Sequence, residues 1–331
     1  MRITKNTVEQ TCQLITEDPE LSASQNQPKR KMSKLSKIIL SLSIIVFFCS
    51  AAMLVKTYIN RQNSIEMNSE LYSQFQNNED ESLFNYDELK SINPGFVGWI
   101  YVPNTNISLP VVKYSDNSFY LKHDFYKKYD YRGTVFMDCR NNEEDFDTNT
   151  ILYGHNCYDG TMFSDLEKFK DIEFYKTTPV IEFHTQNSKD KWKVYAVFIT
   201  SAKKSEDNGY IFNYIYPFLS GENFTGFINE VNKRRLYETD VDITDGDNIL
   251  ILSTCVRDLD IWKNGRCTYR ADARLVVVSR KLRPGESDSV NVDNININSS
   301  PKYPQLWYDK HGIKNPYVND EKWYPQEVVN K

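Results

Sequence analysis

One uncharged stretch constrains this chain more than any other feature of its sequence. Residues 38–55 read IILSLSIIVFFCSAAMLV, an apolar run of 18 residues without a charge. A run of this length can span a bilayer, and it must then be a helix, because no water is present there to satisfy free backbone groups. The stretch therefore predicts a membrane-spanning helix that separates a short N-terminal segment from the bulk of the chain.

The charges around this stretch predict the side of the membrane that each part occupies. Five basic residues precede it within KRKMSKLSK (29–37), whereas only Lys56 and Arg61 follow closely. Because positive charge is retained on the cytoplasmic side, we expect residues 1–37 to be cytoplasmic and the chain beyond the stretch to be exported. A cleaved signal peptide is the alternative, since residues 50–52 form a run of small side chains.

The composition is that of an ordinary globular protein. Hydrophobic residues make up 40% of the chain and charged residues 26%, and the net charge of −5 argues against a binder of nucleic acids. The six cysteines include no CxxC pair, so we expect no metal site and no cofactor. Four of them lie in the exported part, and two of these, Cys157 and Cys267, are additional thiols that could pair or stay free.

The residue pattern changes at residue 96, which marks the start of a β-rich domain. Residues 62–92 have scattered apolar positions that suit one or two short helices, and Asn-Pro-Gly at 93–95 ends them. Beyond this point, β-branched and aromatic residues gather in segments bounded by turn residues. The predicted strands are 96–102, 133–138, 149–155, 179–185, 192–201, 248–255 and 274–282. Their number and close spacing favour a closed barrel or a sandwich.

Two helices are predicted between these strands. The segment 163–169 has Ser164 as its candidate N-cap. The segment 222–238 carries four apolar residues at helical spacing on one face. After the last strand, GESDSVNVDNININSS is typical of a linker, and residues 301–331 regain aromatic side chains.

Three residues with complementary chemistry stand at predicted strand ends. Cys255 and His155 each close a strand, and Arg274 opens one. A thiol must be ionised to attack a carbonyl, so it needs a base or a nearby cation, and the oxyanion that forms needs a donor. If the strands are neighbours, the three side chains meet on one rim. Each also has an ordinary interpretation, as a small core residue, a solvated histidine and a surface charge.

The motifs around these residues resemble those of class B sortases. The resemblance is carried by FVGWIYVPNTNISLPVVKYSDNSFYLKHDF (96–125), GTVFMDCRNN (133–142), YGHN (153–156), LSTC (252–255) and RLVVVSRKL (274–282). Together with the preceding apolar stretch, these blocks stand in the order that the family has.

This resemblance implies a fold and a reaction. Sortases are cysteine transpeptidases on the outer face of Gram-positive bacterial membranes, and their fold is an eight-stranded β-barrel. Class B adds N-terminal helices and a long helix between strands six and seven, for which 222–238 is the candidate. The family's pattern assigns Cys255 as the nucleophile, His155 as the general acid and base, and Arg274 as the stabiliser of the transition state. Such enzymes cut a C-terminal sorting signal after a Thr, hold a thioacyl intermediate and pass it to an amine.

These inferences divide the chain into five expected segments. They are a cytoplasmic tail (1–37), a transmembrane signal-anchor (38–55), an N-terminal helical segment (56–95), a sortase barrel that carries catalysis (96–283) and a C-terminal extension of open role (284–331).

The sequence departs from the family between two of the site residues. Cys255 and Arg274 stand 19 positions apart, which predicts an expanded loop beside the site. Arg266 and Arg270 lie in this loop and are alternative arginines. Arg274 is preferred because it directly precedes the apolar run of its strand, where a guanidinium is held rigidly.

Further residues are candidates for contact with the substrate. Ser253 shares a face of its strand with the nucleophile. Asn117 and Leu121 match positions that line the groove in class B enzymes. Phe227 and Ile228, on the predicted helix, either wall the groove or simply pack that helix onto the barrel.

The resulting hypothesis is a single-pass membrane enzyme with an extracellular catalytic domain. Its expected partners are surface proteins with a C-terminal sorting signal, an amine of peptidoglycan or a pilin lysine as acceptor, and the membrane, but no nucleic acid. Two alternatives stay open: a hydrolytic cysteine endopeptidase, and a non-enzymatic sortase-like module that binds at the cell surface.

Overall fold

A computed structural model describes residues 33–76, 84–144 and 147–326. Residues 1–32 of the expected cytoplasmic tail (1–37) and the last five residues of the extension lie outside the described part. The chain separates into two compact units, one that ends at Asn60 and one that runs from Arg61 onward.

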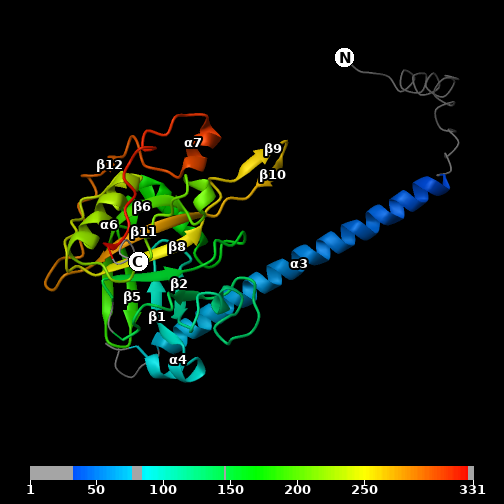
Figure 1. Ribbon diagram of the computed structural model, residues 1–331. Coiled ribbons are helices and arrows are strands. Elements are labelled where there is room, and N and C mark those ends of the chain that lie inside the picture. Colours follow the sequence, from blue (N-terminus) through cyan, green and yellow to red (C-terminus); the bar gives the residue numbers. More distant parts are fainter. Residues whose placement is uncertain (1–32, 77–83, 145–146, 327–331) are drawn as a thin grey trace, which may run out of the picture. The chain divides into compact units, whose positions relative to one another are not determined.

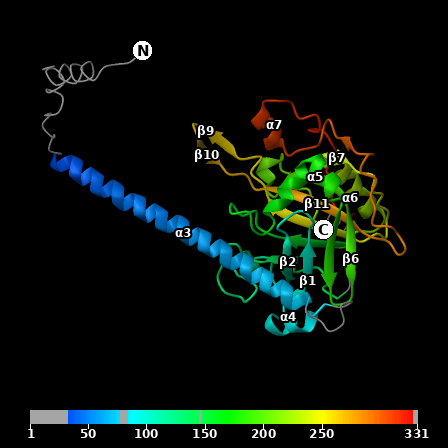
Figure 2. The same cartoon turned by 180° about the vertical axis from the view of Figure 1, so that it is seen from behind.

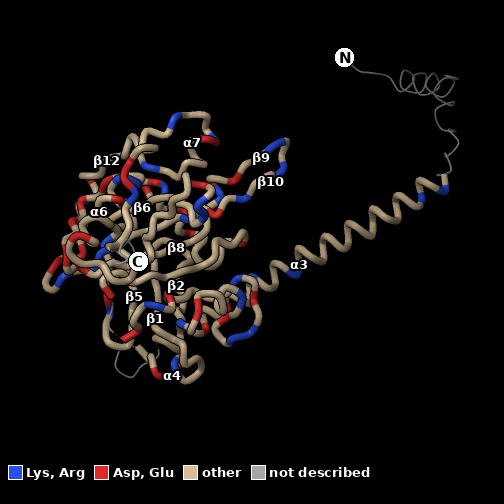
Figure 3. Tube along the Cα trace, in the orientation of Figure 1, with Lys and Arg blue, Asp and Glu red and all other residues tan. Residues whose placement is uncertain are grey.

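The smaller unit holds the first part of a long helix, α3 (Lys34–Gln76). This helix contains an 18-residue window of mean hydropathy 2.7, so its length and composition suffice to cross a membrane. Figure 3 shows no acidic or basic residue along the apolar stretch. Only short helices were expected after residue 62, but α3 continues through Gln76, because residues 56–76 contain no Gly or Pro to end it.

Within the larger unit, the last turns of α3 and the short helix α4 (Tyr86–Ile92) pack on the outside of the first strand. Leu71 and Phe75 of α3 are fully buried there. The Phe75 ring stacks on the Trp99 ring with 5.4 Å between their centroids. These apolar contacts hold the N-terminal helices against the strands, as expected for helices that precede the barrel.

Eight strands form a closed barrel, which confirms the predicted fold class (Figures 1 and 2). The strands follow one another around the barrel in the order β1-β2-β3-β4-β8-β11-β6-β5. Their bounds are β1 Phe96–Tyr101, β2 Ser108–Val112, β3 Val135–Met137, β4 Asn149–Tyr153, β5 Val180–Thr185, β6 Lys189–Ser201, β8 Ile249–Cys255 and β11 Ala273–Lys281. Two neighbouring pairs are parallel, β2 with β3 and β4 with β8, and the others are antiparallel.

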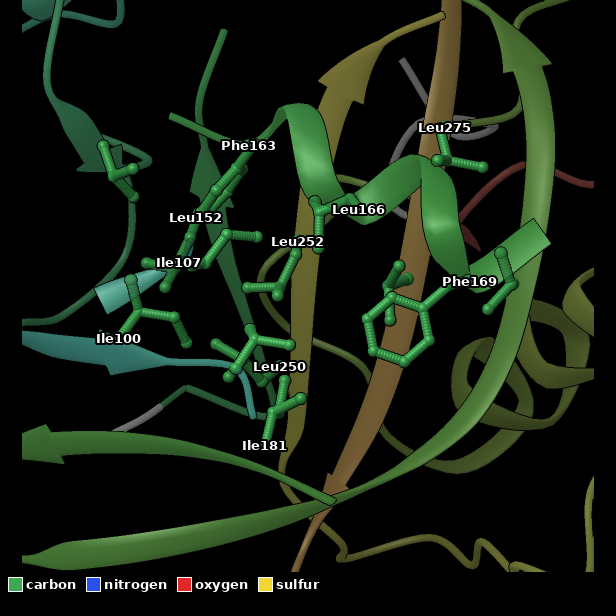
Figure 4. Packing of buried hydrophobic residues seen from close by; sticks show 14 of the residues in the cluster. Ile100, Ile107, Leu152, Phe163, Leu166, Phe169, Ile181, Leu250, Leu252 and Leu275 are labelled. Carbon is green, nitrogen blue, oxygen red and sulfur yellow. The ribbon is translucent and has the colours of Figure 1, made fainter. Parts of the chain in front are cut away.

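The strands alternate between the barrel interior and its outer face, as a period of two requires. Leu250 and Leu252 of β8 belong to the interior cluster, whereas Ile249 and Ile251 belong to a second cluster outside. Figure 4 shows side chains of the interior cluster, among them Leu252 of β8 and Leu275 of β11. Both faces of β8 are therefore buried along most of its length.

The helix α6 (Gly221–Arg234) covers the outer face of the barrel. It follows the sixth barrel strand and precedes the seventh, so the inserted helix is confirmed at its expected place. It ends earlier than the predicted 222–238, because Arg235 leaves the helical conformation and Tyr237–Glu238 forms β7. β7 pairs with β12 (Asn296–Ile297) of the C-terminal segment, a partner that local sequence could not reveal.

Several local predictions are corrected by tertiary contacts. Ser164 does not cap the 3-10 helix η2 (Ser164–Lys170): its hydroxyl donates to the carbonyls of Cys157 and Thr161 instead. The strands predicted from local pattern do not include β2, which contains Pro110, a residue without a backbone N–H. Pro110 is tolerated because β2 pairs with β3 only at its two following residues.

The other short helices are η1 Phe119–Leu121, α5 Ile172–Thr177 and η3 Lys204–Glu206.

The C-terminal segment is attached to the larger unit rather than free as a linker. Besides β12, it contains α7 (Gln305–His311), whose Tyr308 is buried. The indole of Trp323 lies on α6, against Gly226 and Phe227. The expanded loop after β8 forms a separate hairpin of β9 (Ile261–Lys263) and β10 (Arg266–Tyr269), which stands out from the barrel in Figure 1.

Candidate active site

Strand register brings the three candidate catalytic residues to one end of the barrel. β4 and β8 are parallel, with Tyr153 paired to Ser253, so the chain after β4 emerges beside the end of β8. β8 and β11 are antiparallel, and Cys255 is directly paired with Arg274. His155, two residues beyond the end of β4, therefore belongs to the same rim as this pair.

The site lies on the outer face of the barrel and not in its interior. Along β8, Ile251 faces outward, and by alternation so do Ser253 and Cys255. Val276 on β11 also faces outward, which places Arg274 on the same side. A cavity of about 230 Å³ opens there, lined by Asn117, Leu121, Phe136, Tyr153, Gly154, His155, Ser253, Thr254, Cys255 and Arg274.

Cys255 is an exposed free thiol at the end of an otherwise buried strand. Its backbone carbonyl accepts a hydrogen bond of 2.9 Å from the side-chain amide of Asn156. The same amide donates to the Glu167 carboxylate at 2.6 Å. Asn156 thus ties the segment that follows His155 to the backbone of Cys255, while the thiol itself stays open to the cavity.

The backbone around His155 is held on both sides. The Thr254 hydroxyl donates to the Gly154 carbonyl at 2.7 Å, and the Phe163 amide donates to the His155 carbonyl at 2.9 Å. A Cβ on Gly154 would stand 2.6 Å from Cγ of the buried Phe163 ring. Only glycine fits between β8 and this ring, so the position of His155 depends on a close backbone approach.

The imidazole of His155 makes one hydrogen bond that defines its neutral tautomer. Nε2 lies 2.9 Å from the carbonyl oxygen of Leu121. Because a carbonyl oxygen can only accept, Nε2 carries the proton and Nδ1 carries the lone pair of the neutral ring. Nδ1 is therefore the ring nitrogen of the neutral imidazole that can accept a proton.

Arg274 supplies positive charge beside the thiol. Nη1 donates to the Ala273 carbonyl at 3.1 Å and forms an ion pair of 2.6 Å with Asp272. Burial alone would lower the pKa of this guanidinium, but the neighbouring Cys255, Tyr214 and Asp272 raise it above its ordinary value. The side chain therefore stays a cation at every working pH and can oppose negative charge that develops in the cavity.

Two polar residues that shape the cavity were not identified from the sequence. Asp138, fully buried after β3, accepts hydrogen bonds from the Tyr153 hydroxyl at 2.8 Å and from the Asn117 amide at 3.1 Å. The Tyr214 hydroxyl lies 2.9 Å from Oγ of Ser253. Asp138 stands within the block that resembles class B, but no spacing rule marks it, and Tyr214 lies in a loop without a motif.

The structure separates the candidate substrate residues into two groups. Asn117, Leu121 and Ser253 line the cavity. Phe227 and Ile228 do not: they lie buried between α6 and the outer face of the barrel, which is the packing alternative. Because both residues lie on the apolar face of α6, which packs on the strands, their side chains do not reach the cavity.

The structure also shows where the alternative arginines and the additional cysteines lie. Arg266 and Arg270 belong to the exposed hairpin region and do not line the cavity. Cys157 and Cys267 are both free thiols, each half-buried. Burial raises the pKa of the Cys157 thiol to about 11, which leaves it protonated and a poor nucleophile.

Comparison with known proteins agrees with this geometry. The sortase domain family matches residues 100–281. Sortase B of Staphylococcus aureus is 30% identical over 230 residues, which cover 68% of this chain and 91% of that protein.

Solved structures give the same result. Sortase B from Bacillus anthracis, in complex with AAEK1, is similar with a TM-score of 0.56 and 27% identity, over 68% of this chain and 99% of that one. A Staphylococcus aureus sortase B–substrate complex is similar with a TM-score of 0.53 and 28% identity, over 71% of this chain and 99% of that one. Motifs, barrel and relatives lead to one conclusion: the chain belongs to the sortase family and, within it, to class B.

Proposed function

We propose that this sortase is a cysteine transpeptidase that cuts a C-terminal sorting signal after a Thr and transfers the surface protein to an amine. The observation that supports this reaction best is the direct pairing of Cys255 with Arg274 at the strand ends that His155 adjoins. Nucleophile, cation and proton carrier then line one cavity.

In the first half of the proposed reaction, the Cys255 thiol gives its proton to Nδ1 of His155, and the resulting thiolate attacks the carbonyl carbon of the Thr. The carbonyl electrons move to oxygen, and the Arg274 guanidinium opposes the resulting negative charge. When the tetrahedral intermediate collapses, the C–N bond breaks and the leaving amine takes a proton from Nδ1 of His155. The surface protein is then held as a thioester on Cys255.

In the second half, an amine replaces the departed peptide in the cavity. It attacks the thioester carbonyl and gives its proton to Nδ1 of His155, and the C–S bond breaks to restore the thiolate. The acceptor is an amine of peptidoglycan or a pilin lysine. Asn117, Leu121 and Ser253 would contact the sorting signal, since their side chains line the same cavity.

The proposed location follows from the apolar part of α3. With this helix as an uncleaved anchor, the basic residues before it stay in the cytoplasm and the barrel stands outside the cell. Substrates that carry an exported sorting signal would then meet the enzyme at the outer face of the membrane. This arrangement supports a role in attaching surface proteins.

Peptide cleavage by the full-length chain in detergent micelles tests this proposal. Pentapeptides that keep a Thr before the scissile bond are incubated with and without triglycine, and the products are identified by mass spectrometry. We expect cleavage after Thr, a glycine adduct when triglycine is present, and neither product from Cys255→Ala. A covalent mass increase on the wild-type chain would correspond to the thioester.

The alternatives give different products in the same experiment. Cleavage that never yields a glycine adduct, whatever the amine, would indicate a hydrolytic endopeptidase. A chain that cuts no peptide and whose Cys255 does not react with an alkylating reagent would indicate a binding module.

A further inference from the structure

The expanded segment between Cys255 and Arg274 has no role in the reaction as derived so far. It leaves the barrel after β8, forms the β9–β10 hairpin and returns to β11 through Arg270, Ala271 and Asp272. Its last residues therefore stand directly before the strand that carries the guanidinium. The inference that follows rests on the proposed function of Arg274.

Asp272, contributed by this segment, holds the guanidinium of Arg274 from one side. Its Oδ1 lies 2.6 Å from Nη1, which also donates to the Ala273 carbonyl at 3.1 Å. Among the described residues, no hydrogen-bond partner engages Nε or Nη2 of Arg274. These two donors therefore remain available to a substrate, while the Nη1 contacts restrict the rotation of the planar group.

The backbone of Asp272 is fixed in turn by a buried carboxylate. Glu206, on η3, is only 3% exposed. Both of its oxygens accept from the Asp272 amide, each at 3.1 Å. They also accept from the Tyr269 hydroxyl and from the Ser201 hydroxyl, each at 2.6 Å. Glu206 thus fastens the returning end of the hairpin to the end of β6.

Alignment of the barrel strands completes this arrangement. Ser201 is paired with Ala273 and Thr200 with Arg274 across β6 and β11. The anchor point of Glu206 therefore lies on the strand adjacent to the guanidinium, and not in a remote part of the domain. The Ala202 amide also donates to the Asp272 carbonyl at 2.8 Å, so the backbone of Asp272 is held beside the end of β6 as well.

We propose that Asp272 is a positioning residue, held in place by Glu206, which orients Arg274 so that Nε and Nη2 point at the developing oxyanion. The expanded segment then has a defined use: it supplies the carboxylate that keeps the guanidinium in one geometry. An oxyanion donor is effective only when it is oriented before the reaction, so loss of Asp272 lowers the rate of the chemical step more than substrate binding.

A double-mutant cycle on the full-length chain in detergent micelles tests this inference. The substrate is the pentapeptide that the wild type cleaves fastest, and kcat and KM are measured for Asp272→Ala, Arg274→Ala and the double variant. We expect Asp272→Ala to lower kcat about tenfold with KM within about twofold of wild type. In the Arg274→Ala background the same change alters kcat by less than about twofold, because the group through which it acts is absent.

Two further variants separate positioning from a general effect of charge or folding. Asp258→Ala removes a carboxylate of the same segment that is 35% exposed and pairs with Lys170 at 2.9 Å, and it should keep the wild-type kcat. Asp272→Glu keeps the charge and should recover part of the lost rate.

The inference is overturned if Asp272→Ala has the kcat of the wild type, or if its substitution changes only KM. It is also overturned if the substitution lowers kcat by the same factor with and without Arg274. A wild type that cleaves no peptide overturns the proposed function, and this inference with it. Wild-type cleavage with an unaffected Asp272→Ala overturns the inference alone.

Discussion

A single buried carboxylate, that of Asp138, organises one wall of the cavity. It accepts from Tyr153 and Asn117, which both line the cavity, and from Nε of Arg140 at 2.8 Å. Burial alone would raise the pKa of this carboxyl, but hydrogen bonds from Arg140 and Tyr153 hold it below its ordinary value. Asn117 also accepts from the Cys139 amide, so its orientation is set from two sides.

We predict that Asp138→Asn lowers the free energy of unfolding at pH 7 by about 1–3 kcal/mol, because one buried acceptor is replaced by an amide that cannot serve all its donors. A carboxyl with a depressed pKa in the folded state stabilises the fold above its unfolded pKa, near 3.9, and this contribution is lost as the pH falls. The difference between wild type and variant should therefore shrink below about pH 4.

Urea unfolding at pH 7 and at pH 3.5, followed by tryptophan fluorescence, measures this difference. The exposed Asp293→Asn serves as the control and should behave as the wild type at both values. A stability gap for Asp138→Asn that stays constant between the two pH values would contradict the assignment.

At the scale of elements, α6 connects the barrel to the C-terminal segment. One side of it packs on the outer strands through Phe224, Phe227 and Val231. Gly226 has no side chain, and the Trp323 indole packs directly against the helix backbone at this position. A Cβ on residue 226 would stand 2.2 Å from Nε1 of the indole. The Tyr210 hydroxyl adds a hydrogen bond of 2.9 Å to the Trp323 carbonyl.

We predict that Gly226→Ala displaces the Trp323 indole and loosens the segment around it. Alanine favours a helix over glycine by about 1 kcal/mol, whereas a Cβ at this position clashes with the Trp323 indole. Whether the substitution raises or lowers the free energy of unfolding therefore depends on the presence of Trp323. In the Trp323→Ala background, Gly226→Ala should stabilise the chain; in the wild type, it should speed proteolytic cleavage after residue 312. Equal effects in both backgrounds would show that the indole does not depend on Gly226.

At the scale of the whole molecule, the C-terminal segment is part of the larger folding unit. Its Glu286 accepts from Nη1 and Nη2 of the buried Arg280 at 2.6 and 2.7 Å, and from Lys193 at 2.8 Å. Arg280 is on β11 and Lys193 on β6, so one carboxylate joins the segment to two barrel strands. Figure 2 shows α7 on the same body as α6 and β11.

We predict that a chain truncated after Pro284 is less stable than one truncated after Glu286, by about 3 kcal/mol. Both lack β12, α7 and Trp323, but only the first removes Glu286 and leaves Arg280 with Asp242, at 3.4 Å, as its remaining carboxylate partner. Removing a close partner of a buried charge is costly. Thermal unfolding of the two truncated chains in the same detergent measures the difference. Matching unfolding temperatures would exclude a stabilising role for Glu286.

Several features of this protein could be determined from sequence alone because they depend on local patterns. The apolar helix, most strands and the amphipathic α6 follow from composition and periodicity, which act within a few residues. The motifs around Cys255, His155 and Arg274 identified the family, and the family supplied the barrel and the inserted helix. In each case the information lies in consecutive residues.

Tertiary structure decided which of these elements are neighbours. Cys255 faces Arg274 only because β8 pairs with β11 in one register, and His155 joins them through a parallel pairing of β4 with β8, about 100 residues apart. Phe227 turned to the strands instead of the cavity, and the polar segment after β11 is held by Arg280 and α6. Local sequence cannot specify such partners, because they are chosen by burial and by hydrogen bonds between distant parts of the chain.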